Sequence, residues 1–333
     1  MFYLLAFCLG SIQQQPSAFI APDRLMAAAP PVSVLLNHGP STSGGGSSTI
    51  SGETLALGRW SLDWRTDWTD YENVSVAEAE ALAAANGEFD GLGSSLVSTL
   101  AIAYGLTADL QLAAQAGWYQ GSDFLDAEAD GLGGAESAGG DPSGITDLWL
   151  SGKYRLLRGS RGNLAVLAGV KLPTGADGET LSNGEVLEPS SQPGSGATDF
   201  QAGFGYSRFL TTATTLDASA LFTLRGEHQD FSVGDRVDLG VAVAHRLSGG
   251  AAAAPGWTVF GEVLAVALGK DEEGSEANGN SGGTIFFFSP GLRYRCESGV
   301  AITLAPSIPV VQDWNGEQIE TDLKLTCTVS FDW

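Results

Sequence analysis

The sequence predicts an all-β protein, a closed antiparallel transmembrane β-barrel of about 12 strands. The first observation is strict alternation at the carboxyl terminus, where every odd position from Leu323 to Trp333 is apolar and every even position is polar. Successive side chains of a strand point to opposite faces, so this segment has one face suited to lipid and one suited to water. The second observation is that similar segments recur along the chain, and the third is that their connections alternate between long and short.

Alternating segments follow one another from residue 55 onward, and most have the roughly 9–11 residues that a tilted strand needs to cross a bilayer. They cover about 55–71, 95–105, 108–121, 145–157, 163–173, 197–210, 213–225, 234–247, 257–269, 283–297, 299–312 and 321–333. The long connections are rich in Gly, Asp, Glu and Ser and cover 72–94, 122–144, 174–196, 226–233, 270–282 and 313–320. An even strand count puts both termini of the chain on the side of the short turns, which is the periplasm. We therefore expect long acidic extracellular loops and short periplasmic turns.

Composition supports this fold class and excludes others. The chain has 333 residues, 45 glycines and a formal charge of −23. No run reaches the roughly 18 apolar residues of a membrane helix. Strong acidity argues against a nucleic-acid partner, because phosphate binding needs clustered Lys and Arg. Three cysteines form neither a disulfide framework nor a zinc pattern, and we expect no cofactor and no metal.

The amino-terminal region divides into two predicted parts before the barrel. Residues 1–29 are an atypical export signal, in which an apolar core from Phe2 to Leu9 lacks a preceding basic residue. Residues 30–54, Gly/Ser-rich from 38 to 53, are predicted to be a flexible periplasmic lead-in, and residues 55–333 the barrel. The alternative for this region is the disordered tail of a soluble protein.

The phase of the alternation separates lipid-facing from lumen-facing side chains. Trp60, Trp64 and Trp68 share one face of the first segment, as an interfacial aromatic girdle requires. The opposite phase predicts a lumen lined by Arg59, Asp63, Arg65, Asp147, Lys153, Arg155, Lys171, Arg225, Asp238, Arg293 and Arg295. Acidic residues instead fill the long connections, giving a basic wall and an acidic mouth. A soluble two-sheet sandwich also alternates, but it does not require this segregation of charge.

Several runs resemble an outer-membrane transporter family labelled MetA-pathway of phenol degradation. They are Ser51-Gly52-Glu53-Thr54-Leu55, Gly58-Arg59-Trp60-Ser61-Leu62, Asp147-Leu148-Trp149-Leu150-Ser151-Gly152-Lys153-Tyr154-Arg155, Gly169-Val170-Lys171-Leu172-Pro173-Thr174-Gly175 and Gly194-Ser195-Gly196-Ala197-Thr198-Asp199-Phe200. The resemblance covers most of residues 40–333 and implies a barrel that passes hydrophobic or aromatic compounds. It brings no motif of catalytic residues. The leader and the very acidic loops depart from the family pattern.

We therefore predict an outer-membrane channel or uptake protein of a Gram-negative bacterium, without enzymatic activity, for small hydrophobic or aromatic solutes. The expected partners are outer-membrane lipid, lipopolysaccharide, the solutes themselves and the barrel-assembly machinery. One alternative is a structural barrel whose lumen is filled by ion pairs among the inward charges. Another is a lipid-modifying enzyme at the rim, for which His228 with Ser232 is the candidate pair.

Overall fold

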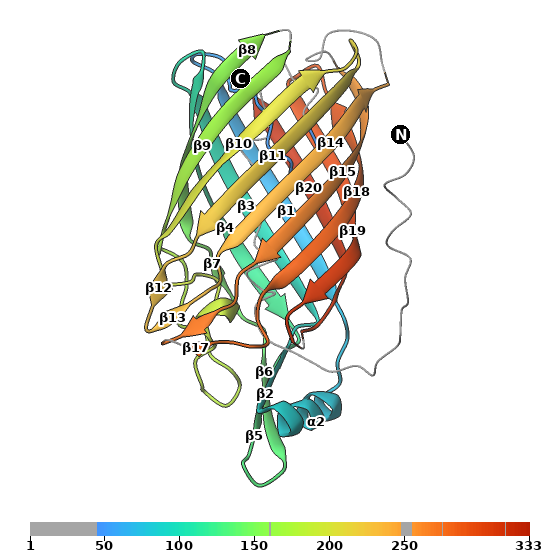
Figure 1. Cartoon of the computed structure of the whole chain (residues 1–333). Coiled ribbons are helices and arrows are strands. Elements are labelled where there is room, and N and C mark those ends of the chain that lie inside the picture. Colours follow the sequence, from blue (N-terminus) through green and yellow to red (C-terminus); the bar gives the residue numbers. More distant parts are fainter. Residues whose placement is uncertain (1–44, 160, 248–254, 275, 317) are drawn as a thin grey trace.

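The computed structural model describes residues 45–159, 161–247, 255–274, 276–316 and 318–333. The predicted export signal, 1–29, and the first part of the predicted lead-in lie outside these residues. Long antiparallel strands form one closed barrel, confirming the predicted fold class (Figure 1). They are β1 (Trp60–Tyr71), β3 (Ser94–Gly105), β4 (Leu110–Ser122), β8 (Leu148–Gly159), β9 (Gly162–Leu172), β10 (Asp199–Phe209), β11 (Thr214–Leu224), β14 (Arg236–Arg246), β15 (Gly256–Leu268), β18 (Gly283–Arg295), β19 (Val300–Trp314) and β20 (Thr321–Asp332).

The barrel closes between its first and last strands. The register pairs Leu62 of β1 with Phe331 of β20, and the backbones of Trp60 and Trp333 exchange two hydrogen bonds. Each remaining long strand pairs with its neighbours in the chain. Closure removes the free strand edges that a membrane cannot hydrate.

The outer wall is apolar and exposed along the strands, with large side chains such as Trp64, Leu100 and Phe204 about half exposed. Two aromatic pairs stand at the short-turn rim, where the ring centroids of Trp60 and Tyr104 are 4.6 Å apart and those of Trp257 and Tyr294 4.7 Å apart. Such a wall suits a bilayer with an interfacial aromatic girdle. A closed barrel with this surface is an outer-membrane protein. Within the described residues, no helix has the length and apolar character needed to span a bilayer.

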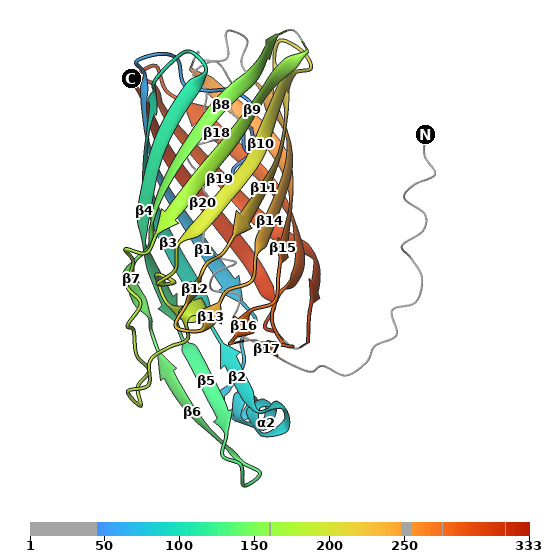
Figure 2. The same cartoon turned by 60° about the vertical axis from the view of Figure 1, so that its left-hand side comes forward.

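The long connections gather at one end of the barrel, opposite the carboxyl terminus, and several of them fold into structure of their own (Figures 1 and 2). Helix α2 (Val76–Asn86) begins at Ser75, whose side chain accepts a hydrogen bond from the Glu78 backbone N–H. It packs on a small sheet of β2 (Glu88–Gly91), β5 (Phe124–Ala129) and β6 (Ala135–Gly140). Ala79, Phe89 and Ala127 are completely buried between them. We call this unit the loop module.

Shorter elements complete this end. Strand β7 (Ser143–Ile145) pairs with β4 beyond the end of β8. A second small sheet joins β12 (Glu227–His228), β13 (Phe231–Ser232), β16 (Glu272–Glu273) and β17 (Glu276–Ala277), and η1 (Pro189–Ser191) is a single turn of 3₁₀-helix. This end of the barrel is therefore built from folded elements rather than from simple loops.

Candidate functional site

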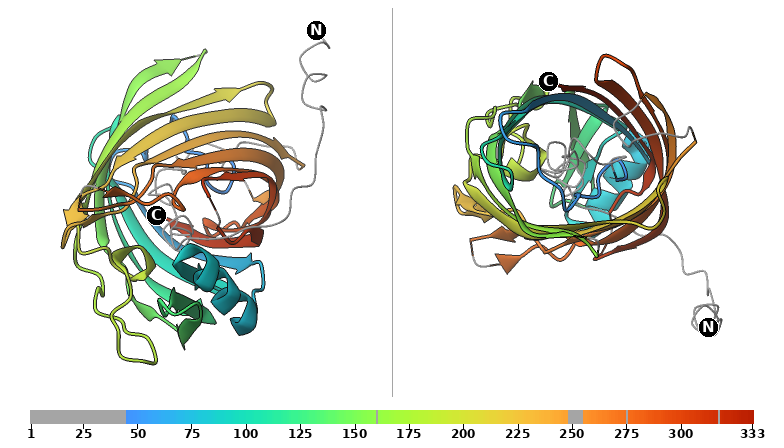
Figure 3. Two further views of the ribbon diagram at one scale, coloured as in Figure 1. Left: turned by 60° about the horizontal axis from the view of Figure 1, so that its bottom comes forward. Right: turned by 90° about the horizontal axis from the view of Figure 1, so that it is seen from above.

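The interior of the barrel contains part of its own chain. Residues 45–55, which we call the lumenal segment, precede β1 and are buried apart from the half-buried Ser48. Figure 3 shows this part of the chain inside the ring of strands when the barrel is viewed along its axis. The sequence predicted a flexible lead-in through residue 54, and for residues 45–54 that prediction is wrong. A Gly/Ser-rich chain has little side-chain bulk, so its backbone can pack where the lumen is narrow.

One buried carboxylate, that of Glu262 on β15, is the main anchor of the lumenal segment. It accepts hydrogen bonds from the backbone N–H and hydroxyl of Ser47, at 2.9 and 2.6 Å, and from the same two groups of Thr49, both at 2.6 Å. The Ser48 N–H donates to it at 3.0 Å. A Cβ at Gly46 would overlap the carboxylate, so any larger residue there would displace Glu262 from these partners.

Cationic side chains hold the carbonyl groups of the same segment. Arg65 of β1 donates to the carbonyl oxygen of Ser47 at 2.7 Å, and Arg293 of β18 donates to those of Gly45 and Gly46 at 3.2 and 3.1 Å. Both guanidinium groups are buried. Hydrogen bonds to charged partners are the stronger class, so these contacts fix the backbone in one path.

The second half of the segment is tied to the opposite side of the wall. Lys153 of β8 donates to the Ser51 carbonyl at 3.4 Å, and the Ser207 hydroxyl of β10 accepts from the Gly52 N–H at 2.8 Å. Gln111 of β4 accepts from the Leu55 N–H at 3.0 Å. The segment thus crosses the lumen from β15 to β4 and narrows it throughout.

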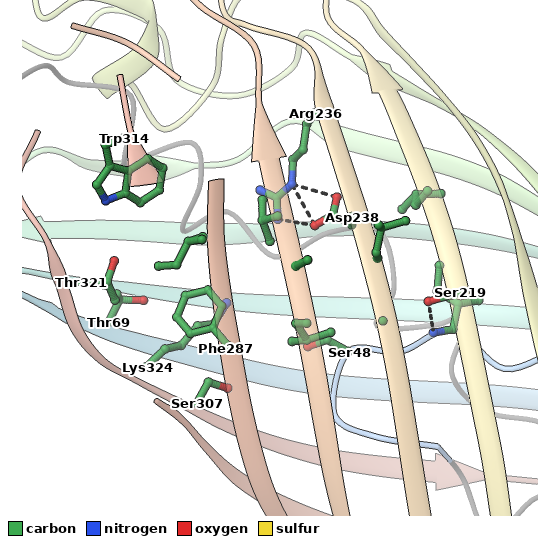
Figure 4. A pocket seen from close by; sticks show the side chains of 18 of the residues that line it. Ser48, Thr69, Ser219, Arg236, Asp238, Phe287, Ser307, Trp314, Thr321 and Lys324 are labelled. Carbon is green, nitrogen blue, oxygen red and sulfur yellow. Dashed lines mark hydrogen bonds and ion pairs between the residues drawn. The ribbon is translucent and has the colours of Figure 1, made fainter. Parts of the chain in front are cut away.

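A cavity of about 840 Å³, its open side included, lies between the lumenal segment and the wall formed by β11, β14, β15, β18, β19, β20 and β1. Figure 4 shows Phe287 and Trp314 on one side of it and Arg236 with Asp238 on another. Its apolar lining includes Ile50, Leu221, Leu264, Val266, Ile285, Phe287 and Trp314.

Two cations border this cavity, and each has an acidic partner. Arg236 binds Asp238 with its Nη2 atom 2.7 Å from the carboxylate, and Lys324 lies 3.4 Å from Asp67. Asp67 also pairs with Arg65 at 2.5 Å. The site therefore combines apolar walls with a polar edge on which Arg236 pairs with Asp238 and Lys324 shares Asp67 with Arg65. Apolar walls with a few polar groups are typical of small-molecule sites.

The structure places most of the predicted lumen residues on the inner wall. Asp63, Arg65, Lys153, Arg155 and Arg293 are buried there. Asp238 and Arg295 are partly exposed toward the interior, and Arg295 pairs with Asp332 at 2.9 Å. Arg155 pairs with Asp109 at 2.8 Å at the short-turn rim.

Three of the predicted residues lie outside the long strands, and one of them, Asp147, stands immediately before β8. Arg59 is exposed at the rim, one residue before β1, so it does not line the lumen as predicted. Arg225 follows β11, and its Nε and Nη1 atoms have no hydrogen-bond partner within the described residues. Alternation alone cannot show where a strand begins or ends, which explains all three differences.

A separate cluster joins two of the sequence motifs quoted above. Lys171, at the end of β9, lies 2.6 Å from Asp199 and 3.2 Å from Asp147, and it donates to the Ser195 hydroxyl. Asp147 also accepts from the backbone N–H groups of Gly175 and Ser195, at 2.8 and 3.1 Å. The Lys-Leu-Pro-Thr-Gly and Gly-Ser-Gly-Ala-Thr-Asp runs therefore meet in one buried ion cluster, which fixes the 174–196 connection to the barrel end.

An acidic cavity of about 730 Å³, its open side included, lies among the long connections. It is lined by Glu88, Asp90, Asp126, Glu128, Glu185, Val186 and Glu188. Burial, followed by the neighbouring carboxylates, raises the pKa of Glu188 to about 7 and that of Asp126 to about 6. Among the described residues, no group of three or more His, Cys, Asp or Glu side chains has the arrangement of a metal site. These acids come from three separate long connections, 72–94, 122–144 and 174–196, and only the fold brings them together.

The barrel resembles solved outer-membrane structures. The COG4313 outer membrane channel from Pseudomonas putida F1 aligns with a TM-score of 0.59 at 13% identity, over 84% of this chain and 97% of that one. The CymD monoaromatic hydrocarbon channel aligns with a TM-score of 0.40 at 10% identity, over 84% and 88% of the two chains. At these identities the first likeness supports the fold alone, and the second carries no argument.

Comparison of the sequence with known proteins gives two results. No protein with a curated description matches the chain. Residues 94–305, well over half of the chain, match the model of the family described as "Putative MetA-pathway of phenol degradation". The chain belongs to that family.

Proposed function

We propose that this protein is an outer-membrane channel for small hydrophobic or aromatic, phenol-like solutes. The observation that carries the proposal is the cavity between the lumenal segment and the wall, with aromatic and aliphatic side chains on several sides and the Arg236 and Lys324 cations at its edge. Apolar walls favour an aromatic ring, because transfer of the ring out of water is favourable. A nearby cation can donate a hydrogen bond to a phenol oxygen or contact the ring face.

The lumenal segment gives this channel its constriction. Its contacts with Glu262, Arg65 and Arg293 hold it within the barrel lumen. A solute therefore passes only beside the segment or after the segment has moved. We infer a narrow, selective passage rather than a wide water-filled pore. The long connections face the cell exterior in this orientation, as barrels of this class place them.

Two neighbouring positions on β15 test the assignment of the cavity. Val266→Trp adds an indole ring to the cavity wall, whereas Val263→Trp adds the same ring to the lipid-facing side, where Val263 is 49% exposed. Uptake of radiolabelled phenol by cells that produce the protein is expected to fall with Val266→Trp and to be unchanged with Val263→Trp. Equal uptake by the two variants, at equal amounts of heat-modifiable protein, would contradict the role of the cavity.

A structural barrel with a filled lumen is the second candidate. The specific observation in its favour is the number of short contacts that join the lumenal segment to the wall, together with the Arg65–Asp67 and Arg236–Asp238 pairs. In that case neither phenol uptake nor ion current depends on the protein. A rim enzyme has less support, because within the described residues no hydrogen bond joins His228 to Ser232, and the nearest acid to His228 is Asp177 at 3.9 Å.

A further inference from the structure

The short-turn end of the barrel carries most of the exposed positive charge of the described residues. The exposed lysine and arginine side chains are those of Arg59, Arg158, Arg161, Arg208 and Lys270, and all except Lys270 stand at this end. Arg158, Arg161 and Arg208 come together at the ends of β8, β9 and β10, which lie side by side in Figure 2. None of these three side chains has a hydrogen bond or an ion pair within the part of the chain that the structure describes.

Two of these arginines belong to the outer face of the barrel. Arg208 continues the outward phase of Phe204 and Tyr206 on β10. Arg161 immediately precedes β9, and its carbonyl oxygen accepts a hydrogen bond from the Tyr206 hydroxyl at 2.6 Å. Gly162 has a φ of 125°, and a Cβ there would overlap the Tyr206 ring. Tyr206 therefore joins the backbone beside Arg161 to the strand that carries Arg208.

A β-bulge adds apolar surface beside the two arginines. The register of β8 against β9 shifts between Arg155 and Leu157, so that Leu157 pairs with Leu164, an outward position of β9. Strict alternation from Arg155 would have turned Leu157 inward, and a bulge re-aims the side chains that follow it. Leu156 and Leu157 are 51% and 60% exposed. We call Leu156, Leu157, Arg161, Tyr206 and Arg208 the outer corner.

Arg158 lies on the other side of the same pair of strands. It pairs in register with Asn163, whose side-chain amide donates to the carboxylate of Glu53, in the lumenal segment, at 3.1 Å. Arg158 is therefore a lumen-side cation, although only a few positions separate it from the outer corner. It carries the same charge as Arg161 and is also exposed.

The outer corner lies at the depth of lipid headgroups. The aromatic pairs Trp60–Tyr104 and Trp257–Tyr294 stand at the same rim, and such girdles mark the interface between membrane and water. A lipid-facing arginine is tolerated at this depth but not in the middle of the bilayer. No carboxylate competes for the two arginines on these strands, because β8 and β9 contain no Asp or Glu and the only acid of β10, Asp199, is at the opposite end.

We propose that the outer corner binds the headgroup of an anionic phospholipid, such as phosphatidylglycerol, in the periplasmic leaflet. Guanidinium groups donate charge-assisted hydrogen bonds to phosphate oxygens, and two cations without protein partners complement a headgroup with net negative charge. The exposed leucines contact the acyl chains of the same lipid. A zwitterionic headgroup also has a phosphate, but the arginines repel its ammonium group. The site is independent of the proposed channel function.

Native mass spectrometry of the detergent-solubilised protein tests the site. The probes are phosphatidylglycerol and phosphatidylcholine with the same acyl chains, and the parent protein is expected to retain phosphatidylglycerol preferentially. Arg161→Gln with Arg208→Gln should lower retention of phosphatidylglycerol about tenfold or more and leave that of phosphatidylcholine unchanged. The matched control, Arg59→Gln with Arg158→Gln, removes two exposed charges from the same rim outside the outer corner and should retain the preference.

A second variant separates charge from geometry. Arg161→Lys with Arg208→Lys keeps both charges without the planar guanidinium, so it should retain the preference at reduced strength. Equal retention of phosphatidylglycerol by the parent and the glutamine variant of the outer corner, both migrating as heat-modifiable barrels, would overturn the site. An equal loss in the control pair would overturn it as well, because it would show a response to net charge alone.

Discussion

Glu262 should control whether the lumenal segment stays in place. Its carboxylate accepts hydrogen bonds from Ser47, Ser48 and Thr49 at 2.6–3.0 Å and is completely buried. The substitution Glu262→Gln keeps the size of the side chain and one acceptor oxygen but removes the charge. The amide nitrogen then faces N–H and hydroxyl donors. It has no acceptor to offer them, so part of the anchor is lost.

The size of the effect follows from these contacts. A hydrogen bond to a charged group contributes about 1.5–3 kcal/mol net, and neighbouring bonds are not additive. If about half of the anchor is lost, the docked state of the segment is destabilised by about 2–4 kcal/mol, which is about a 30- to 1,000-fold change in the docked-to-undocked ratio. Arg65 and Arg293 retain their contacts with the Ser47 and Gly45 carbonyls, so docking is weakened rather than abolished.

Planar-bilayer recordings are the direct assay, and we expect a higher open probability for Glu262→Gln than for the parent protein. A second readout is the labelling of Ser48→Cys by a membrane-impermeant maleimide, which should be faster in the Glu262→Gln background. Glu272→Gln is the matched control, because Glu272 is exposed on β16 and distant from the lumenal segment in the fold. Unchanged current together with unchanged labelling would refute the assignment of Glu262 as the anchor.

Three further predictions concern the ends of the barrel. Lys171→Met leaves Asp147 and Asp199 buried without their cation and should cost about 3–5 kcal/mol of barrel stability, measured by urea unfolding of the detergent-solubilised protein, with the exposed Lys270→Met as control. Raised pKa values of Asp126 and Glu188 mean that folding takes up protons, so the loop module should lose about 1–2 kcal/mol of stability as pH rises from 4.5 to 7; after correction for intrinsic rates, hydrogen exchange in α2 and β5 should be slower at the acidic end, and the opposite order would contradict the burial of these acids. Deletion of Phe331–Trp333 removes the Leu62–Phe331 pair and the Trp60–Trp333 hydrogen bonds, so membrane insertion should fail, and a truncated chain that still migrates as a heat-modifiable barrel would show that closure lies elsewhere.

The strands were predictable because each carries its own signal. A lipid-facing strand alternates over its full length, as Leu323 to Trp333 does, and no distant residue is needed to interpret it. The loop module was not predictable in this way. Ala79, Phe89 and Ala127 come from three short elements that become a core only when tertiary contacts assemble them. Helix α2 has no strong apolar stripe along the sequence to mark it as helical.

The candidate site divides along the same line. The alternation of polar and apolar residues was enough to predict that Arg65, Lys153 and Arg293 point inward. Successive side chains of a strand face opposite sides of the barrel wall. It gave no sign of what they bind, since their partners are backbone carbonyls of a Gly/Ser-rich run with no periodic pattern. The composition of that run alone predicts that it does not pack. Its partner Glu262 is more than 200 positions away in the chain, beyond the range of any local pattern.

That separation also affects the order of assembly. Ser47 and Glu262 are 215 residues apart, and Arg293 follows on the next long strand, so the lumenal segment has no complete docking site until most of the wall exists. Contacts so distant in sequence form late, because the loop they close must first be ordered. The lumenal segment therefore docks only after β15 and β18 have joined the wall. Any change that slows docking would prolong the time that the lumen spends without this constriction during biogenesis, even if the finished protein were normal.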